Sequence, residues 1–277
     1  MEQKAHSYPG GTLPLLTSPL LGAAPGGGFA HGFPTRAGGV SPPPYESLNF
    51  GRGWGDAAAH VAENRRRIQV ACGGTRLALA RQVHGAVVRV VTDDTTTDET
   101  PPDADAVVCH LPGVAVGVFS ADCVPLLMAD VRTGAVAAVH AGWRGVIAGV
   151  APAAISAMQA GFGTRASDLR VAIGPAIGLC CFEVGDEVAA TFRSAFPEEA
   201  AEGSLTRLGP RGKPHVDLKR ALARQLADAG VGTAQVDVGP ECTRCDPEGR
   251  FYSYRRDNTK TGQHLAIIVA RAAIPPG

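Results

Sequence analysis

The chain has 277 residues, and its 26 basic side chains balance 26 acidic ones, so the formal net charge is zero. This length suits one large domain or two small ones, and a hydrophobic fraction of 45% excludes a disordered chain. The balanced charge excludes a strong sequence-independent attraction to nucleic acid. The sequence has no apolar run of membrane-spanning length and no recognisable secretory signal. We therefore expect a cytoplasmic protein with neither a nucleic-acid nor a membrane partner.

The N-terminal half is predicted to begin with a flexible tail and to continue as strands. Residues 1–28 are rich in Gly, Pro, Ala and Leu, which indicates the tail. Asp56 is placed to cap a helix that runs to about Ala71, where two glycines end it. A polar loop is predicted over residues 93–98. Strands, most of them rich in Val, are predicted over residues 29–33, 86–91, 106–109, 114–119 and 135–139.

The C-terminal half mixes helices with strands. A helix is predicted after Gly145, with a kink at Pro152. Helices are also predicted over residues 186–195 and 217–229, and strands over 170–173, 234–238 and 265–270. The mixture predicts an α/β (α+β) fold in which residues 29–277 form a single domain with mixed β-sheets flanked by helices.

Three Val- or Ala-rich segments each carry a residue able to bind metal next to glycine or proline. The residues are His84 in Gln-Val-His-Gly, Cys123 in Ala-Asp-Cys-Val-Pro, and His140 in His-Ala-Gly-Trp-Arg-Gly. Imidazole and thiolate are ligands that zinc prefers, and a three-ligand set is typical of a catalytic zinc site with one open position. The spacing matches no zinc finger or ribbon. Hydrogen-bonded core histidines and a buried, unreactive cysteine therefore stay open as the alternative.

These strings resemble the YfiH-type family, formerly called multicopper polyphenol oxidase or laccase domain. Further motifs agree with the resemblance, which extends from about Phe29 to Val269. They are the strings His-Gly-Phe-Pro-Thr-Arg-Ala-Gly-Gly-Val-Ser from His31, Ser-Leu-Asn from Ser47, Ile-Gly-Pro-Ala-Ile-Gly from Ile173 and Phe-Tyr-Ser-Tyr-Arg-Arg-Asp from Phe251.

The resemblance implies an enzyme: a zinc-dependent purine nucleoside phosphorylase with adenosine deaminase activity. Its substrates would be adenosine, and also inosine, guanosine or methylthioadenosine, together with phosphate. The family's metal ligands map onto His84, Cys123 and His140, the residues that the chemistry singles out. Two positions depart from the family pattern: Phe182 stands where Tyr is frequent, and Gln263 stands where Arg commonly follows Thr-Gly.

Phosphorolysis requires a cationic site for phosphate and polar contacts to the nucleoside. Arg36, beside Gly38 and Gly39, and Arg144, four residues after His140, are the candidates for phosphate, with Ser41 close to the first of them. Asn49 is the candidate for a sugar hydroxyl or base edge. A structural ion pair for either arginine, with a carboxylate such as Asp122, and an Asx-turn for Asn49 remain the alternatives.

Other functions use the same residues. Cys123 with His140 or His84 as base would suit a metal-free cysteine hydrolase. Copper is the alternative metal, although a multicopper oxidase uses His-x-His pairs, which this chain lacks. A non-enzymatic binding or scaffold module is a further alternative. The sequence leaves open whether the protein is a monomer or a small homo-oligomer.

Two cysteine pairs lie outside this set. Cys242 and Cys245 form a lone C-x-x-C, without the second pair of a zinc ribbon, which favours a buried or loop role. Cys180 and Cys181 are adjacent and cannot easily pair with each other.

Overall fold

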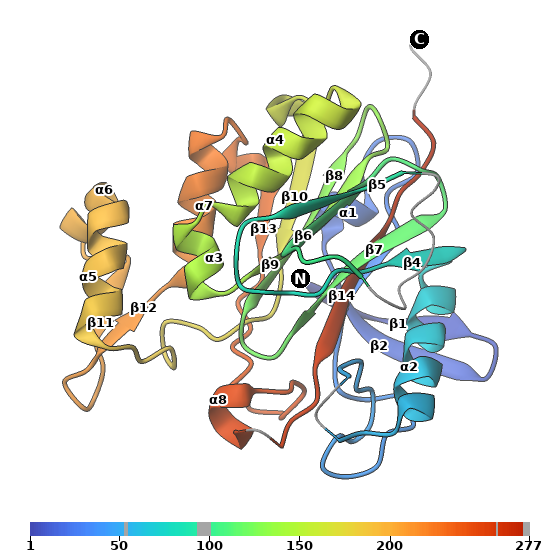
Figure 1. The fold of residues 1–277 in the computed structure, drawn as a ribbon, viewed down its shortest axis with the longest axis horizontal. Coiled ribbons are helices and arrows are strands. Elements are labelled where there is room, and N and C mark those ends of the chain that lie inside the picture. Colours follow the sequence, from blue (N-terminus) through green and yellow to red (C-terminus); the bar gives the residue numbers. More distant parts are fainter. Residues whose placement is uncertain (53–54, 93–100, 259, 274–277) are drawn as a thin grey trace.

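Two six-stranded mixed sheets form the centre of the molecule (Figure 1). The computed structural model describes residues 1–52, 55–92, 101–258 and 260–273. In the first sheet β4 is parallel to β7, and the other neighbours are antiparallel. Its order is β1 (Glu2–Tyr8), β2 (Gly11–Thr17), β3 (His31–Pro34), β14 (His264–Val269), β7 (Val114–Ser120) and β4 (Arg76–Ala78).

The second sheet is also mixed, which confirms the predicted architecture. The pairs β10–β13 and β5–β6 are parallel, and the remaining pairs are antiparallel. A separate two-stranded sheet consists of β11 (Thr206–Leu208) and β12 (Pro214–Val216). The order of the second sheet is β13 (Val236–Val238), β10 (Leu169–Ile173), β8 (Val124–Asp130), β9 (Val136–Ala141), β6 (Ala106–Cys109) and β5 (Val88–Val91).

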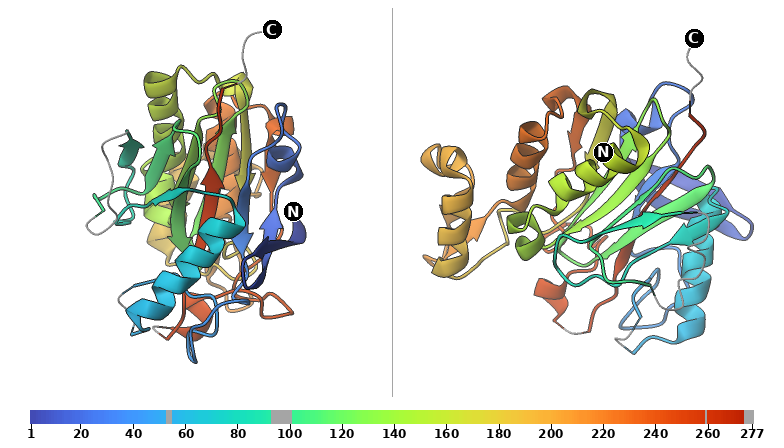
Figure 2. Two further views of the ribbon diagram at one scale, coloured as in Figure 1. Left: turned by 90° about the vertical axis from the view of Figure 1, so that its right-hand side faces the viewer. Right: turned by 45° about the horizontal axis from the view of Figure 1, so that its top comes forward.

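Helices flank the two sheets. Residues of α3, α4 and α7 pack on the second sheet, and α2 packs on the first. With β11 and β12, α5 and α6 stand to one side of the sheets (Figures 1 and 2). The helices are α1 (Pro19–Gly22), α2 (Ala58–Ala71), α3 (Trp143–Ile147), α4 (Val150–Phe162), α5 (Asp186–Ala195), α6 (Pro197–Ala201), α7 (Leu218–Asp228) and α8 (Tyr254–Asp257), with 3₁₀ turns at Ala166–Asp168 and Thr233–Gln235.

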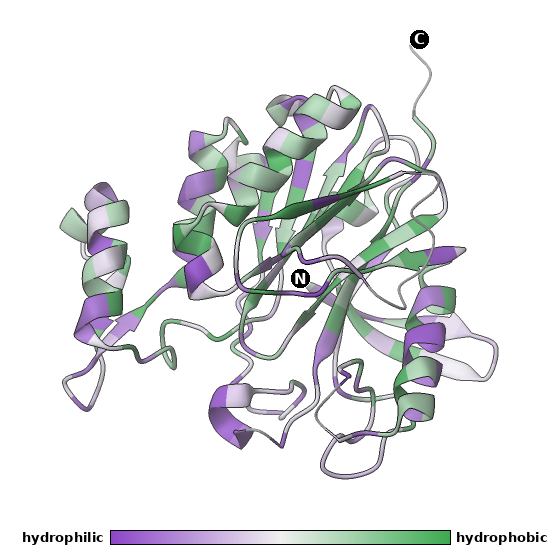
Figure 3. Cartoon of the chain, viewed as in Figure 1, coloured by the Kyte–Doolittle hydropathy of each residue, from purple (hydrophilic) through white to green (hydrophobic). Residues whose placement is uncertain are grey.

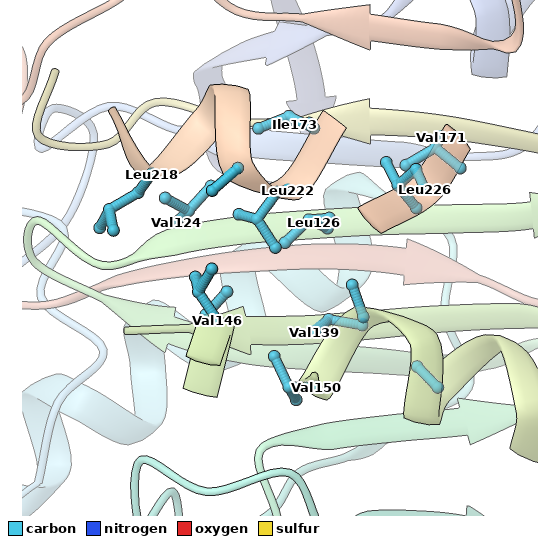
Figure 4. Packing of buried hydrophobic residues seen from close by; sticks show 14 of the residues in the cluster. Val124, Leu126, Val139, Val146, Val150, Val171, Ile173, Leu218, Leu222 and Leu226 are labelled. Carbon is cyan, nitrogen blue, oxygen red and sulfur yellow. The ribbon is translucent and has the colours of Figure 1, made fainter. Parts of the chain in front are cut away.

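The core lies in three layers, and β14 shows how the sequence creates them. Its residues 265, 267 and 269 pack toward α2, whereas Ala266 and Ile268 pack between the sheets, because successive strand side chains point to opposite faces. Hydrophobic residues accordingly concentrate along the central strands (Figure 3). The third layer lies between the second sheet and helices α3, α4 and α7, and it includes Val139, Val150 and Leu222 (Figure 4).

The prediction of a flexible tail over residues 1–28 is wrong. Residues 2–17 form the hairpin of β1 and β2, and Leu13, Leu15 and Leu16 are fully buried. Pro14 lies within β2 and has no backbone N–H to donate. However, the carbonyl oxygen of Pro14 accepts a hydrogen bond from the backbone N–H of Thr35, so the strand joins β3 in spite of the missing donor.

Other differences have local causes. The strand β8 was not predicted, because all its residues are buried and its sequence therefore lacks alternation. The helix predicted after Gly145 is divided at Gly149, which has a φ of 77°. Pro152 does not kink it, because it lies in the first turn of α4, where a backbone N–H has no acceptor in the helix and the lack of one in proline costs no hydrogen bond.

The prediction that Asp56 caps α2 is wrong, because the N-cap is Ala57 and the Asp56 carboxylate accepts instead from the Ala57 N–H and from Nδ2 of Asn49. Several other predictions agree with the structure. The strands at 106–109 and 170–173 and the helix at 186–195 are confirmed, and Asp217 caps α7 by accepting from the N–H of Arg220. The loop predicted at 93–98 lies outside the described residues. In the described part of the chain, no helix combines the length and apolar character needed to span a membrane.

Candidate active site

His84, Cys123 and His140 meet where the two sheets join. Cys123 lies in the connection from β7 of the first sheet to β8 of the second, and His140 lies near the end of β9. The ligand atoms of the three residues all lie within 4.8 Å of one another. Nε2 of His84 is 3.9 Å from Sγ of Cys123, and the two imidazole rings are nearly perpendicular, at 89°. The structure thus brings together the three residues that the sequence singled out.

Two residues of this site have left-handed backbone conformations. His84 has a φ of 61°, and Asp122, which precedes Cys123, has a φ of 95°. Such values are rare for residues with a Cβ and persist where surrounding contacts hold them. For Asp122 these contacts include hydrogen bonds from Thr243 Oγ1 and from the Arg255 backbone N–H to its two carboxylate oxygens. The loops are therefore held in the conformations that present His84 and Cys123.

Asp105 organises the histidines. It is fully buried before β6, and its carboxylate accepts hydrogen bonds from the backbone N–H groups of Val83, His84 and Gly85 and from Nδ1 of His140. Burial opposes its ionisation, but these hydrogen bonds and the charge of His140 lower the pKa of Asp105 below its usual value. Because Nδ1 of His140 donates to Asp105, Nε2 is left to face Cys123.

Cys123 and His140 shift each other's pKa. Burial alone would raise the pKa of the Cys123 thiol, but the charge and hydrogen bond of His140, with smaller effects from His84, lower it to about 6. Burial also opposes protonation of His140, whereas the Cys123 thiolate and Asp105 raise the pKa of His140 to about 9. The thiolate form that a metal requires is therefore favoured near neutral pH.

The space beside the three residues fits a metal ion. Zinc ligands at 2.0–2.3 Å from a tetrahedral centre lie about 3.3–3.8 Å apart, close to the separation of His84 and Cys123. Gly142 leaves this space open: a Cβ there would lie 2.9 Å from Cδ2 of His84 and 3.2 Å from Sγ of Cys123. The His/Cys/His donor set and the bare Gly142 backbone both fit a bound metal.

The three residues line a cavity of about 690 Å³ whose described wall is strongly cationic. Its carboxylate, Asp122, already accepts hydrogen bonds on both oxygens. Among the described residues, Arg144 forms no ion pair, and its guanidinium lies 4.4 Å from the Trp143 ring centre. The arginines that line the cavity are Arg52, Arg65, Arg81, Arg144 and Arg255.

Arg36, Ser41 and Asn49 do not line this cavity, and their contacts with phosphate and nucleoside stay predictions. Arg36 lies in a separate surface hollow, where its Nε donates to the Glu46 carbonyl oxygen and its guanidinium lies over the Tyr252 ring. The reason is tertiary: after β3 the backbone of Arg36 pairs with that of Arg250 and of Ser47.

Asn49 and Ser41 are buried in the loop structure around α2. The Oδ1 of Asn49 accepts from the N–H of Gly51, which is the Asx-turn left open above, and also from the N–H of Gln263. The Oγ of Ser41 accepts from Nδ2 of Asn64. Both side chains therefore support the loop around α2.

Both departures from the family pattern fall in the cavity wall. Phe182 packs under the guanidinium of Arg255, 5.1 Å from the ring centre, and Gln263 lies beside Gly51. Sequence reasoning missed Asp105 and Arg255. A carboxylate directly before a fully apolar strand was the available signal for Asp105, and the string from Phe251 that carries the family resemblance was the available signal for Arg255.

Known proteins are similar over nearly the whole chain. Residues 30–271 match the family model described as multi-copper polyphenol oxidoreductase laccase. A purine nucleoside phosphorylase of Deinococcus radiodurans is 40% identical and covers 92% of either chain. Another, from Mycobacterium tuberculosis, is 40% identical over 84% of this chain and 89% of its own. The crystal structure of YlmD from Geobacillus stearothermophilus, 35% identical, superposes with a TM-score of 0.82 over 94% of this chain and 96% of that one.

Proposed function

The chain belongs to the multi-copper polyphenol oxidoreductase laccase family, and from this membership we propose that it is a zinc-dependent purine nucleoside phosphorylase. It would cleave adenosine and related purine nucleosides with phosphate to the free base and ribose 1-phosphate. Relatives named purine nucleoside phosphorylase support the reaction class. The observation that carries the proposal is the cationic cavity beside the three ligand residues.

The arginines suit the phosphate. In the reaction a phosphate oxygen bonds to C1′ of the ribose while the C1′–N9 bond breaks and its electron pair leaves with the purine, which takes up a proton. Arg144 is the best-placed cation, since it lies in the helix that follows His140 and forms no ion pair with a described carboxylate. Its planar fork of donors can hold the phosphate beside C1′.

The rest of the cavity suits a purine nucleoside. Phe119, Trp143 and Phe182 supply apolar surface for the base, and Gln82 and Gln263 supply amide groups near them. Gln82 is itself fixed by two hydrogen bonds to the Phe119 backbone, so it shapes the wall more than it contacts substrate. A volume of about 690 Å³ is in the range of small-molecule sites.

His84, Cys123 and His140 would hold the zinc, with Asp105 fixing the orientation of His140. Bound zinc supplies a Lewis acid that polarises an oxygen or nitrogen of the substrate. The chain itself keeps Cys123 as thiolate and presents a cationic wall to the anion. We propose adenosine deamination as a side activity of this same cavity.

A metal-free cysteine hydrolase is the second candidate, because Cys123, His140 and Asp105 form a Cys-His-Asp arrangement. The position of His84 favours the metal site instead. A hydrolytic dyad needs one imidazole at the sulfur, whereas here a second one lies 3.9 Å from it. Copper remains the alternative metal, suggested by the family name and not by the donor set.

Chromatography of adenosine incubated with the purified protein, together with its metal content, tests the proposal. Adenine is expected only when phosphate is present, inosine marks deamination, and zinc should accompany activity. Folded, zinc-loaded protein that releases neither product would overturn the proposal. Activity that survives complete zinc removal would support the cysteine hydrolase, and stoichiometric copper with a blue absorption band would support the oxidase.

A further inference from the structure

Four cysteines outside the active site lie together although the sequence places them in two distant pairs. The Sγ atoms of Cys180, Cys181, Cys242 and Cys245 all lie within 4.8 Å of one another. In the sequence Cys242 and Cys245 look like a lone C-x-x-C, because Cys180 and Cys181 lie about 60 positions before them. Two adjacent cysteines also match no familiar metal-ligand spacing. The fold supplies the missing half of the set.

Parallel strands explain why the two pairs meet. The strand β13 pairs with β10 in parallel, with Val238 opposite Ile173, so the segments that follow the two strands leave the sheet side by side. A bridge between Ala176 and Cys242 continues the pairing, and the N–H of Thr243 donates to the Ala176 carbonyl oxygen. Segment 174–181 therefore brings its cysteines against segment 239–245.

The geometry suits one tetrahedral ion. Four thiolates at about 2.3 Å from a zinc ion lie about 3.8 Å apart. The Sγ atoms of Cys180 and Cys245 are 3.5 Å apart. A turn closed by the N–H of Cys181 donating to the Gly178 carbonyl oxygen allows the adjacent cysteines to reach one centre. Cys181 is buried while Cys180 and Cys245 are exposed, so an ion can enter from solvent.

A hydrogen-bond donor and a cation lie next to the sulfur of Cys242. The N–H of Gly178 donates to Sγ of Cys242 over 3.2 Å. The buried amine of Lys219 donates to the carbonyl oxygens of Gly239 and Glu241, which places one positive charge next to the cysteine pair. Backbone N–H donors and a nearby cation both favour the anionic sulfur that binds metal.

We propose that Cys180, Cys181, Cys242 and Cys245 bind a second zinc ion, which has a structural role. Four protein ligands complete a tetrahedral shell and leave no position for substrate, in contrast to the three-ligand site at Cys123. Thiolate ligands select zinc over magnesium or calcium.

The structural ion supports the active site through Asp122. Thr243 Oγ1 donates to the Asp122 carboxylate over 2.6 Å, and the N–H of Ile177 donates to the Asp122 carbonyl oxygen over 2.9 Å. The two donors come from the two segments that the cysteines would join. Fixing these segments fixes the left-handed Asp122 and, with it, the adjacent Cys123.

Zinc counting on the full chain tests the proposal. Protein purified under reducing conditions with added zinc, then freed of loosely bound metal, is expected to hold about two zinc ions per chain if both sites fill. Cys245→Ser and Cys180→Ser should each lose one of them. Cys123→Ser should lose the other, and Cys72→Ala, outside both clusters, should lose none. Because Cys180 and Cys245 are exposed, serine at either position disturbs no packing, and circular dichroism checks the fold.

Cobalt loading identifies the ligands independently. In Cys123→Ser protein the remaining cobalt should give intense sulfur-to-metal charge-transfer absorption, as expected for four thiolates, and Cys245→Ser added to that background should weaken or abolish it. Zinc content unchanged in both Cys245→Ser and Cys180→Ser would overturn the proposal. So would a Cys180–Cys245 disulfide in the reduced preparation, or iron with acid-labile sulfide at these cysteines. If instead His84, Cys123 and His140 bind no zinc, Cys123→Ser would leave the zinc count unchanged.

Discussion

Nδ1 of His140 lies 2.8 Å from Oδ1 of Asp105, and this contact links the candidate metal site to the sheet beneath it. The same carboxylate accepts three backbone N–H groups from the loop that carries His84. One buried side chain thereby positions two of the three ligands, although Asp105 does not itself line the cavity.

Asp105→Asn is expected to weaken zinc binding by about 10- to 100-fold, since an amide would replace one accepting oxygen with a donor that repels the N–H groups facing it. Competition with a chelator of known affinity measures the change. The exposed Asp228→Asn is the control. Unaltered zinc affinity in folded Asp105→Asn would show that the carboxylate does not orient the ligands.

Gly142→Ala is expected to abolish zinc binding at the three-residue site, because its Cβ would lie 2.9 Å from His84 and 3.2 Å from the Cys123 sulfur. Gly161→Ala is the matched control, since a Cβ at this helical position meets nothing within 4 Å. The control should keep its zinc and show equal or slightly higher stability. Equal zinc content in the two variants would contradict the close packing at Gly142.

His84→Ala and Cys123→Ala are each expected to remove zinc from this site and to abolish phosphorolysis while the fold remains. His84 is exposed and Cys123 lies in a loop, so neither supplies much core packing. Metal analysis, turnover and circular dichroism measure the three properties, and the exposed His110→Ala serves as control. Full turnover by either variant would remove that residue from the ligand set.

Arg144→Ala is expected to raise KM for phosphate about 10- to 100-fold, the value of one charge-assisted hydrogen bond to an anion, with a smaller effect on KM for the nucleoside. Arg132→Ala is the control, because Arg132 is paired with Asp168 and lies outside the cavity. Initial rates over a series of phosphate concentrations give both constants. An unchanged KM for phosphate would assign the anion to another arginine.

Stability is expected to fall as the pH drops from about 6.5 toward 4 because of two buried histidines. Burial lowers the pKa of His31 to about 4 and that of His264 to about 3, and Nε2 of each accepts a backbone N–H. In this range the unfolded chain binds protons that the folded chain excludes, so lower pH favours unfolding.

Each histidine can contribute up to about 1.4 kcal/mol per pH unit to this slope. Urea unfolding at several pH values should therefore show a shallower slope for His31→Gln, which keeps an acceptor but does not titrate. The exposed His110→Gln should retain the wild-type slope. Parallel slopes for wild type and His31→Gln would mean that His31 is not held neutral.

Local sequence determined the elements whose signals are local. The strand at 106–109 and the helix at 186–195 follow from β-propensity and helix pattern, and the Asp217 cap follows from its position. The strand β8 was not predicted, because all its residues are buried and its sequence has no alternation of apolar and polar residues. The hairpin of β1 and β2 was not predicted, because its leucines are buried only when β2 pairs with β3, which is distant in the sequence.

The same division holds for the sites. Residue chemistry and family resemblance selected His84, Cys123 and His140, since ligand type is a property of each side chain. Whether Arg36, Asn49 or Arg255 reaches the cavity depends on loop paths, which no short-range pattern encodes.

The chain has seven cysteines, and side-chain type and motif resemblance alone distinguished Cys123 among them. The tertiary structure gave four others a common place, because parallel pairing of β10 and β13 brings together segments about 60 residues apart. It likewise gathered five of the arginines around one cavity, so a chain with no net charge presents a local cationic site. The sequence by itself determines which side chains can bind a metal or an anion. Long-range strand pairing determines which of these side chains lie close together.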